Sequence, residues 1–238
     1  MDADRPGSRV ARRIACRLDG RRSHRLLDRS FALPSPSDDL ASDLTIDFVG
    51  GAVGHRHRFG GGRGQDLPKA AGFAKGFTPT IVDATAGLGR DAFLLASLGA
   101  QVTLIERSPQ VYARLSEAIA TARAADPATA AAAERMTLLH GDARELLTAL
   151  SPDVVTVDPM HPERTSSALV KKDMRTLRDL VGTDPDQLEL MTAALAAARK
   201  RVVLKWPRKA PSMPGLRAPS HQIIGKTLRY DVFMTPQT

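Results

Sequence analysis

Cysteine and aromatic residues are scarce in this chain of 238 residues, and no apolar run is long. The single cysteine, Cys16, excludes an internal disulfide and any zinc site built from cysteines. No stretch approaches the roughly 20 apolar residues of a membrane-spanning helix, so we expect no membrane partner. Aromatic residues make up 4% of the chain, which argues against a broad base-stacking platform of the kind found in many single-strand binders. These absences favour a protein of the reducing cytoplasm.

Acidic residues are fewer than basic residues in this chain. The chain has 34 Lys and Arg residues against 26 Asp and Glu residues, a formal net charge of +8. This balance favours a polyanionic partner such as a nucleic acid, because lysine and arginine release counterions from phosphates. The length and the hydrophobic content of 42% are sufficient for one α/β domain with a sizeable core and an appendage.

The first 40 residues differ in composition from the rest. Residues 1–30 hold nine arginines and four aspartates with little apolar periodicity, and a cluster of prolines and serines follows at Leu33–Asp39. The segment lacks the apolar core of a secretory signal. We therefore predict a basic, poorly ordered arm over 1–40 and one folded domain over 41–238. Within that domain, a glycine-rich basic loop over 50–65 precedes a cofactor-binding half over 80–150.

The stretch from Thr80 to Pro109 has the form of a nucleotide-cofactor half-domain. It predicts a buried strand over Thr80–Ala84, a turn with Gly87 and Gly89, a helix, and a second strand that runs into Glu106. In such units the glycines allow the backbone to approach the ligand, and the acidic residue about 20 positions on accepts hydrogen bonds from ribose hydroxyls.

Further strands and helices alternate along the chain and predict a Rossmann-like α/β fold. Strands are expected over Leu44–Val49, Met136–Leu139, Asp153–Val157 and Arg201–Lys205, with a terminal antiparallel pair over His221–Gly225 and Leu228–Met234. The alanine-rich segment Ala124–Ala133 is expected to be interrupted by Pro127. This alternation is typical of a mainly parallel sheet with helices on both faces. Ligands of such sheets bind at the carboxyl ends of the strands. Four carboxylates are predicted there: Asp83, Glu106, Asp142 and Asp158.

The glycine turn alone leaves the cofactor open. Gly87, Gly89 and Ala92 match the dinucleotide pattern, so NAD is an alternative, and the turn could also be an ordinary α/β connection. However, Asp83 precedes the glycines, where a carboxylate would repel a pyrophosphate but could hold an ammonium group. Carboxylates at four strand ends suit a ligand with a cationic head, a ribose and an adenine. We therefore predict S-adenosylmethionine as the cofactor.

The segment Asp158-Pro159-Met160-His161 resembles the Asn/Asp-Pro-Pro-aromatic tetrapeptide of amino-group methyltransferases. An exocyclic amine on a base is a poor nucleophile because its lone pair is conjugated into the ring. An acceptor at Asp158 and the backbone carbonyl of Pro159 could together favour the attacking geometry, and the fixed backbone of proline would make them converge. The fourth residue, here His161, would stack on the base. Alternatively, Asp-Pro simply ends a strand.

Several longer runs together resemble one family, the bacterial small-subunit (16S) ribosomal RNA guanine-N2 methyltransferases of the J type (RsmJ). The runs are Asp47–Ala52, His55-Arg56, Phe59–Gly64, Asp83–Phe93, Asp158–Met160 and Ser167–Lys172, and the match extends from about Asp47 to the C-terminus. The resemblance implies a class I S-adenosylmethionine-dependent methyltransferase domain and an rRNA guanine-N2 substrate. It also implies cofactor contacts at Arg90, Asp91, Glu106, Arg107, Asp142, Ala143 and Asp158.

The chain departs from the family pattern in three places. His161 replaces a phenylalanine, and His140–Ala143 replaces small hydroxyl residues. Residues 1–40 do not resemble the folded N-terminal subdomain of the family.

A set of basic residues could line the rim around Asp158 and contact the phosphates of 16S rRNA or the small ribosomal subunit: Arg56, Arg58, Arg63, Lys171, Lys172, Arg175, Lys205 and Arg208. His55 and His57 have no third ligand nearby, so we predict no metal site. Three other functions remain open: an amine methyltransferase acting on DNA or another RNA, an NAD-dependent oxidoreductase, and a non-catalytic RNA-binding assembly factor with a degenerate cofactor fold.

Overall fold

The computed structural model describes residues 44–50, 62–159, 176–177 and 186–236. The arm predicted over 1–40 and most of the loop over 50–65 lie outside the described residues. The same holds for six of the predicted site residues: Arg56, Arg58, His161, Lys171, Lys172 and Arg175.

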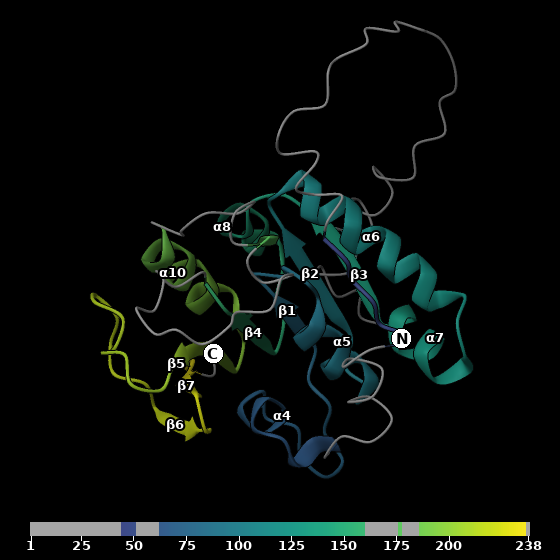
Figure 1. Cartoon of the computed structure of the whole chain (residues 1–238). Coiled ribbons are helices and arrows are strands. Elements are labelled where there is room, and N and C mark those ends of the chain that lie inside the picture. The colour runs from purple at the N-terminus through teal and green to yellow at the C-terminus, as the bar shows by residue number, and fades with distance from the viewer. Residues whose placement is uncertain (1–43, 51–61, 160–175, 178–185, 237–238) are drawn as a thin grey trace, which may run out of the picture.

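One seven-stranded sheet organises the molecule, in the order β3-β2-β1-β4-β5-β7-β6 (Figure 1). The strands are β1 (Ile81–Asp83), β2 (Val102–Glu106), β3 (Met136–His140), β4 (Val154–Val157), β5 (Arg201–Pro207), β6 (His221–Ile224) and β7 (Leu228–Met234). Strands β1 to β5 pair in parallel, whereas β7 is antiparallel to both β5 and β6. The predicted fold class, with its terminal antiparallel pair, is confirmed. The sequence did not predict that β7 lies between β5 and β6.

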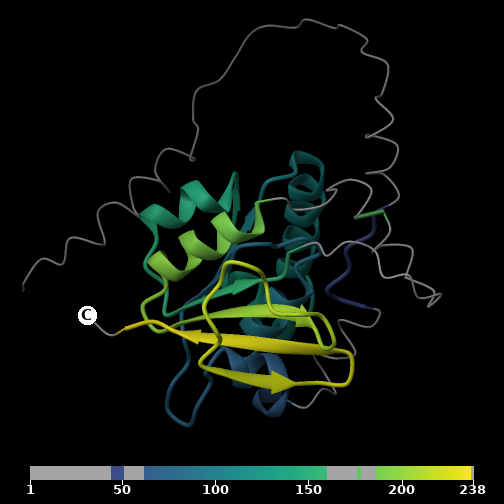
Figure 2. The same ribbon diagram turned by 90° about the vertical axis from the view of Figure 1, so that its left-hand side faces the viewer.

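Helices cover both faces of this sheet (Figure 2). Residues of α4 (Asp66–Ala70), α5 (Arg90–Ser97), α6 (Pro109–Arg123) and α7 (Pro127–Glu134) share one core cluster with alternate residues of the strands. Residues of α8 (Ala143–Leu146) and α10 (Gln187–Ala197) share a second cluster with the intervening strand residues. None of the helices within the described ranges is both long and apolar enough to cross a membrane.

Two local predictions differ from the structure. Leu44–Val49 was expected to form a strand, but residues 44–47 have no regular secondary structure and residues 48–50 form a bend. The Asp47 carboxylate accepts hydrogen bonds from the backbone N–H groups of Val49 and Gly50, each at 2.9 Å, which gives the backbone a turn in place of a strand ladder. The buried Phe48 ring stacks on Phe93 with a centroid distance of 4.7 Å.

The second difference concerns the alanine-rich segment that Pro127 was expected to interrupt. Pro127 instead begins α7, since its missing N–H is not needed in the first helical turn. Asp126 caps this helix by accepting hydrogen bonds from the backbone N–H groups of Ala128 and Thr129.

Candidate active site

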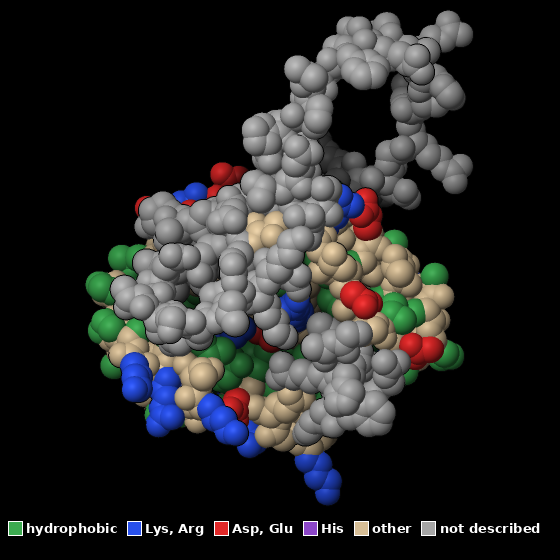
Figure 3. All heavy atoms as spheres, viewed as in Figure 1, with side chains coloured by type: hydrophobic (Ala, Val, Ile, Leu, Met, Phe, Trp, Pro, Cys, Tyr) green, Lys and Arg blue, Asp and Glu red, His purple; other side chains and the backbone are tan. Residues whose placement is uncertain are grey.

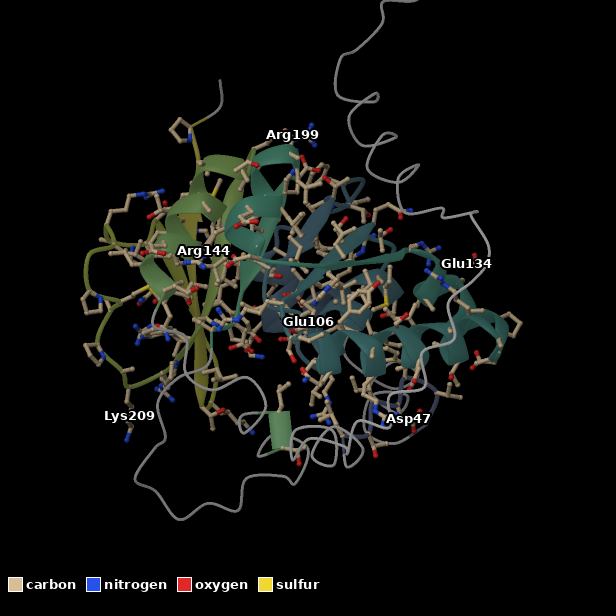
Figure 4. The ribbon with its side chains drawn as sticks, turned by 90° about the horizontal axis from the view of Figure 1, so that it is seen from above. Asp47, Glu106, Glu134, Arg144, Arg199 and Lys209 are labelled. Atoms are coloured by element: carbon tan, nitrogen blue, oxygen red, sulfur yellow. The ribbon has the colours of Figure 1, made fainter. Side chains whose placement is uncertain are left out.

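The carboxyl ends of the parallel strands gather acidic side chains and one lysine. Side chains alternate between the two faces of a strand, so residues two apart share a face. Asp83, Glu106 and Lys205 each lie two positions after a hydrophobic strand residue. Those residues belong to the core cluster that packs against α5: Ile81, Leu104 and Val203. The three charged residues therefore lie on the α5 face of the sheet. Figure 4 shows Glu106 near the middle of the molecule, whereas Arg199, which precedes β5, lies toward the opposite ends of the strands.

Glu106 fixes the glycine turn to the end of β2. Its Oε2 accepts a hydrogen bond from the N–H of Gly87 at 2.9 Å, and its Oε1 accepts one from the N–H of Ser108 at 2.8 Å. Gly87 has a φ of 49°, in the left-handed region that favours glycine. Burial raises the pKa of the Glu106 carboxyl above its usual range, against the opposing effect of these backbone donors. Each oxygen has a second lone pair, so the carboxylate can still accept from another donor.

Gly89 permits close packing where α5 begins. Its φ is 66°, and a Cβ at this position would lie 2.7 Å from Leu115 Cδ1 and 3.0 Å from Phe48 Cζ. A larger residue would displace the start of α5 from the core.

Asp83 is a buried carboxyl at the end of β1. Burial, together with the neighbouring charges of Asp91 and Asp158, raises its pKa to about 7, against the lowering effects of the Lys205 charge and of a hydrogen bond from the N–H of Thr85 at 3.3 Å. Asp83 therefore changes its charge near neutral pH.

Asp158 follows β4 and is held from two sides. Its N–H donates to Thr85 Oγ1 at 2.7 Å, which ties it to the loop after β1. Its Oδ2 lies 2.7 Å from Lys205 Nζ, and the same nitrogen lies 2.7 Å from Asp91 Oδ2 in the first turn of α5. The Asp158 side chain is 49% exposed, whereas Pro159, directly after it, is buried.

Asp142 belongs to a second group of charges, at the start of α8. Its Oδ1 accepts a hydrogen bond from the N–H of Arg144 at 2.9 Å, and its Oδ2 pairs with the Arg144 guanidinium at 2.6 Å. The hydrogen bonds from the Arg144 side chain hold the pKa of Asp142 below its usual range. Arg144 also pairs with Asp186 at 3.2 Å and with Glu189 of α10 at 2.6 Å, and Arg107 pairs with Asp186 at 3.2 Å.

Comparisons with known proteins agree on one family. The model of a family described as "Putative SAM-dependent methyltransferase" matches residues 19–235. A protein named ribosomal RNA small subunit methyltransferase J, from Agrobacterium fabrum, is 71% identical over 80% of this chain and 92% of its own length. A protein of the same name from Brucella anthropi is 64% identical over 81% of this chain and 94% of its own length.

A solved structure, that of a SAM-dependent methyltransferase from Neisseria gonorrhoeae, is 38% identical. It matches 80% of this chain and 74% of its own with a TM-score of 0.64. This chain belongs to the ribosomal RNA small subunit methyltransferase J family. The resemblance predicted from the sequence is confirmed, S-adenosylmethionine is the cofactor of the family, and the NAD alternative is set aside. The family match begins at residue 19, further toward the N-terminus than the predicted start near Asp47.

Among the residues predicted for the J-family site, the structure brings together those on the α5 face. Asp83, Gly87, Glu106 and Asp158 all lie at the carboxyl ends of β1, β2 and β4, and Arg90 and Asp91 begin α5 directly after Gly89. Arg107, Asp142 and the buried Ala143 lie toward α8 and α10, within or beside the charge group of Arg144.

Two residues predicted to contact phosphates do not fit that expectation. Lys205 forms ion pairs with Asp91 and Asp158 and does not belong to the rim. Arg63 donates hydrogen bonds to the Ala74 carbonyl at 3.0 Å, to Thr78 Oγ1 at 2.8 Å and to the Leu98 carbonyl at 3.2 Å. Thr78 precedes β1 and Leu98 follows α5, so Arg63 lies at the amino end of the strands, away from Asp158.

Sequence reasoning missed Thr85, Arg144 and Asp186. Thr85 was within the glycine-turn motif, and its distance of two residues from Asp83 was the signal that could have identified it. Arg144 and Asp186 come from separate parts of the chain, and no spacing in the sequence connects them. Across the described residues, no three His, Cys, Asp or Glu side chains are grouped so that they could hold a metal.

Proposed function

We propose that this protein methylates the exocyclic N2 amine of a guanosine in 16S rRNA, with S-adenosylmethionine as the methyl donor. The observation that carries the proposal is Asp158, an exposed carboxylate held by Thr85 and Lys205 beside the glycine turn. The family relatives are named as small-subunit rRNA methyltransferases, which supports the choice of RNA. The segment that begins with Asp158 supports an amine as the acceptor.

The residues at the strand ends fit this cofactor chemically. Asp83 and Asp158 are carboxylates near the glycine turn and suit a cationic amino-acid end. Glu106 is anchored by two backbone donors and retains lone pairs for ribose hydroxyls. Asp142 and Ala143 begin α8 after β3, where they would meet the adenine. When bound, S-adenosylmethionine supplies a methyl carbon on a sulfonium: the N2 lone pair forms the N–C bond, and the electrons of the broken C–S bond remain on sulfur.

Asp158 would orient the amine for this transfer. A carboxylate oxygen and the Pro159 carbonyl can both accept hydrogen bonds from the N2 hydrogens, which turns the nitrogen lone pair away from the ring plane. The nitrogen becomes positive as the new bond forms, and a carboxylate stabilises that charge. The amine must then release one proton. Because half of the Asp158 side chain is exposed, the proton can leave through this carboxylate to water.

The described part of the chain also offers basic side chains to an RNA backbone at the same ends of the strands. Figure 3 shows Lys and Arg side chains gathered at the lower left, over the β6–β7 part of the sheet. The exposed residues Arg208 and Lys209 follow β5, and Lys226 lies in the adjacent turn, where the N–H of Arg208 donates to the Thr227 carbonyl. We propose that these three residues contact phosphates, in addition to those predicted in the segments outside the described residues.

The proposal is tested by replacing Asp158 and measuring single-turnover methyl transfer to small ribosomal subunits. Asp158→Ala should lower the rate at least about a hundredfold, because amine orientation exists only in the reactive complex. Asp158→Asn should be milder, since its amide oxygen still accepts one hydrogen bond but cannot balance charge on the nitrogen. Glu134→Gln, at an exposed carboxylate at the end of α7, is the control and should leave the rate unchanged. A full rate for Asp158→Ala would show that the segment only ends a strand.

A further inference from the structure

Lys205 is a largely buried cation between two carboxylates of the site. Its side chain is 22% exposed, and its ammonium lies 2.7 Å from both Asp91 Oδ2 and Asp158 Oδ2. Burial alone would lower the pKa of Lys205, but the charges of Asp158 and Asp91 outweigh it and hold the pKa above its usual range. The ammonium is therefore charged at neutral pH.

The sheet register explains why Lys205 meets Asp158. In the parallel pairing of β4 with β5, Val157 lies opposite Leu204, so the next residues along the two strands, Asp158 and Lys205, are neighbours. On β5, Leu204 and Trp206 pack into the cluster on the α10 side, which leaves Lys205 on the α5 face with Asp91. No other basic side chain among the described residues forms an ion pair with either carboxylate.

This position has a consequence for Asp158. A carboxylate that is half exposed beside Asp83 and Asp91 would otherwise be repelled by them and would turn toward solvent. The ammonium instead fixes one oxygen, Oδ2, while Thr85 fixes the backbone N–H of the same residue. The side-chain torsion and the backbone of Asp158 are then both fixed, so the second carboxylate oxygen, Oδ1, also has a fixed orientation.

We propose that Lys205 is a positioning residue that holds Asp158 Oδ2, so that the other carboxylate oxygen is presented to the acceptor amine. The proposal deepens the function proposed above and rests on it. It assigns Lys205 to the chemistry rather than to phosphate binding. Two other roles make different predictions: a phosphate contact would affect RNA affinity, and a purely structural ion pair would affect stability alone.

The test uses Lys205→Met, which keeps the length of the side chain and removes the charge. Single-turnover methyl transfer should fall at least about tenfold, because a carboxylate that is no longer held spends less time in the productive geometry. The acid limb of the pH–rate profile should move to higher pH, since the charge of Lys205 lowers the pKa of Asp83 and its loss makes that carboxyl ionise less readily. The affinity for small subunits and its salt dependence should not change.

Lys200→Met is the matched control. Lys200 also pairs with a carboxylate, Asp153, at 3.6 Å, but it precedes β5 at the far end of the strands and should leave rate and profile unchanged. Lys205→Arg restores the positive charge on a group of different shape. The acid limb of the pH–rate profile of this variant should therefore return to the wild-type position even if the rate does not. This variant decides the question if Lys205→Met proves unstable.

A double-mutant cycle gives the sharpest reading. If Lys205 acts through Asp158, then Lys205→Met should have little further effect on the rate in an Asp158→Asn background. Full additivity, an unchanged single-mutant rate, or a loss that follows RNA affinity with a reduced salt dependence would each overturn the proposal. Wild-type protein that forms no N2-methylguanosine would instead overturn the proposed function itself.

Discussion

The raised pKa of Asp83 predicts that cofactor binding depends on pH near neutrality. This carboxyl is buried at the end of β1 and titrates at about pH 7. If its ionised form holds the ammonium of S-adenosylmethionine, binding must first remove the proton. With a pKa of about 7, the affinity should fall about 15-fold between about pH 7 and about pH 5.5. The cofactor's own amino group remains protonated over most of this range.

Calorimetric titration of wild type and Asp83→Asn measures this effect. The variant should bind more weakly at neutral pH and should show little pH dependence, because the amide does not titrate. The ratio of the two affinities removes any titration that the cofactor contributes. Asp142→Asn is the control: its carboxyl pKa lies below the usual range, so its replacement should leave the pH dependence in place. A wild-type affinity that is constant over this range would refute the role assigned to Asp83.

The same carboxyl also affects stability, with a defined sign. The folded-state pKa is raised above the ordinary 3.8, so the folded protein binds this proton more tightly than the unfolded chain does. The resulting stabilisation is complete below about pH 4 and is lost as the pH rises through about 7. Asp83→Asn removes the burial of a charge and should raise the free energy of unfolding at about pH 8 by up to about 4 kcal/mol. Denaturant unfolding at acidic and alkaline pH should show a smaller pH dependence in the variant.

Three further predictions follow from other contacts. Glu106→Gln should weaken S-adenosylmethionine binding about tenfold in calorimetry, since an amide replaces one of two anchored acceptor oxygens; unchanged affinity would exclude the ribose assignment. Arg208→Ala combined with Lys209→Ala should reduce the salt slope of RNA binding by about 0.7–0.9 per lost phosphate contact, with cofactor affinity constant, whereas an unaltered slope would make both residues ordinary surface charges. Arg229→Met should lower the free energy of unfolding by about 3–5 kcal/mol, because its buried guanidinium pairs with Asp231 and donates to three carbonyls at the end of β5 and in the turn after it. A free energy of unfolding within about 1 kcal/mol of wild type, as measured by denaturant unfolding, would contradict this prediction.

Local pattern was sufficient to predict the half of the site that is contiguous in the sequence. The strand that ends at Asp83, the turn with Gly87 and Gly89, and the strand that ends at Glu106 follow one another within about one βαβ unit. Their hydrophobic runs mark where each strand ends, so the carboxyl edge could be located without a structure. The same reasoning identified Asp158, because its strand has a clear apolar run and a proline after it.

Contacts between distant segments could not be predicted in this way. Lys205 and Asp91 are 114 positions apart, and only the order and register of the sheet bring them together. From the sequence Lys205 was one basic residue among many, and the excess of positive charge suggested phosphate contact. Arg63 was assigned to the rim for the same reason, although its donors are taken by carbonyl groups at the other end of the strands. Charge composition predicts a class of partner but does not identify which basic side chains contact that partner.

The most direct test of the central claim is the identity of the methylated nucleoside. Small subunits from a strain that lacks this enzyme would be incubated with the protein and with S-adenosylmethionine labelled in its methyl group, and the rRNA would then be digested to nucleosides. We expect the label in N2-methylguanosine from 16S rRNA, and we expect the Asp158→Ala protein to add almost none. Label on another atom or another base, or no transfer by the wild-type protein, would contradict it.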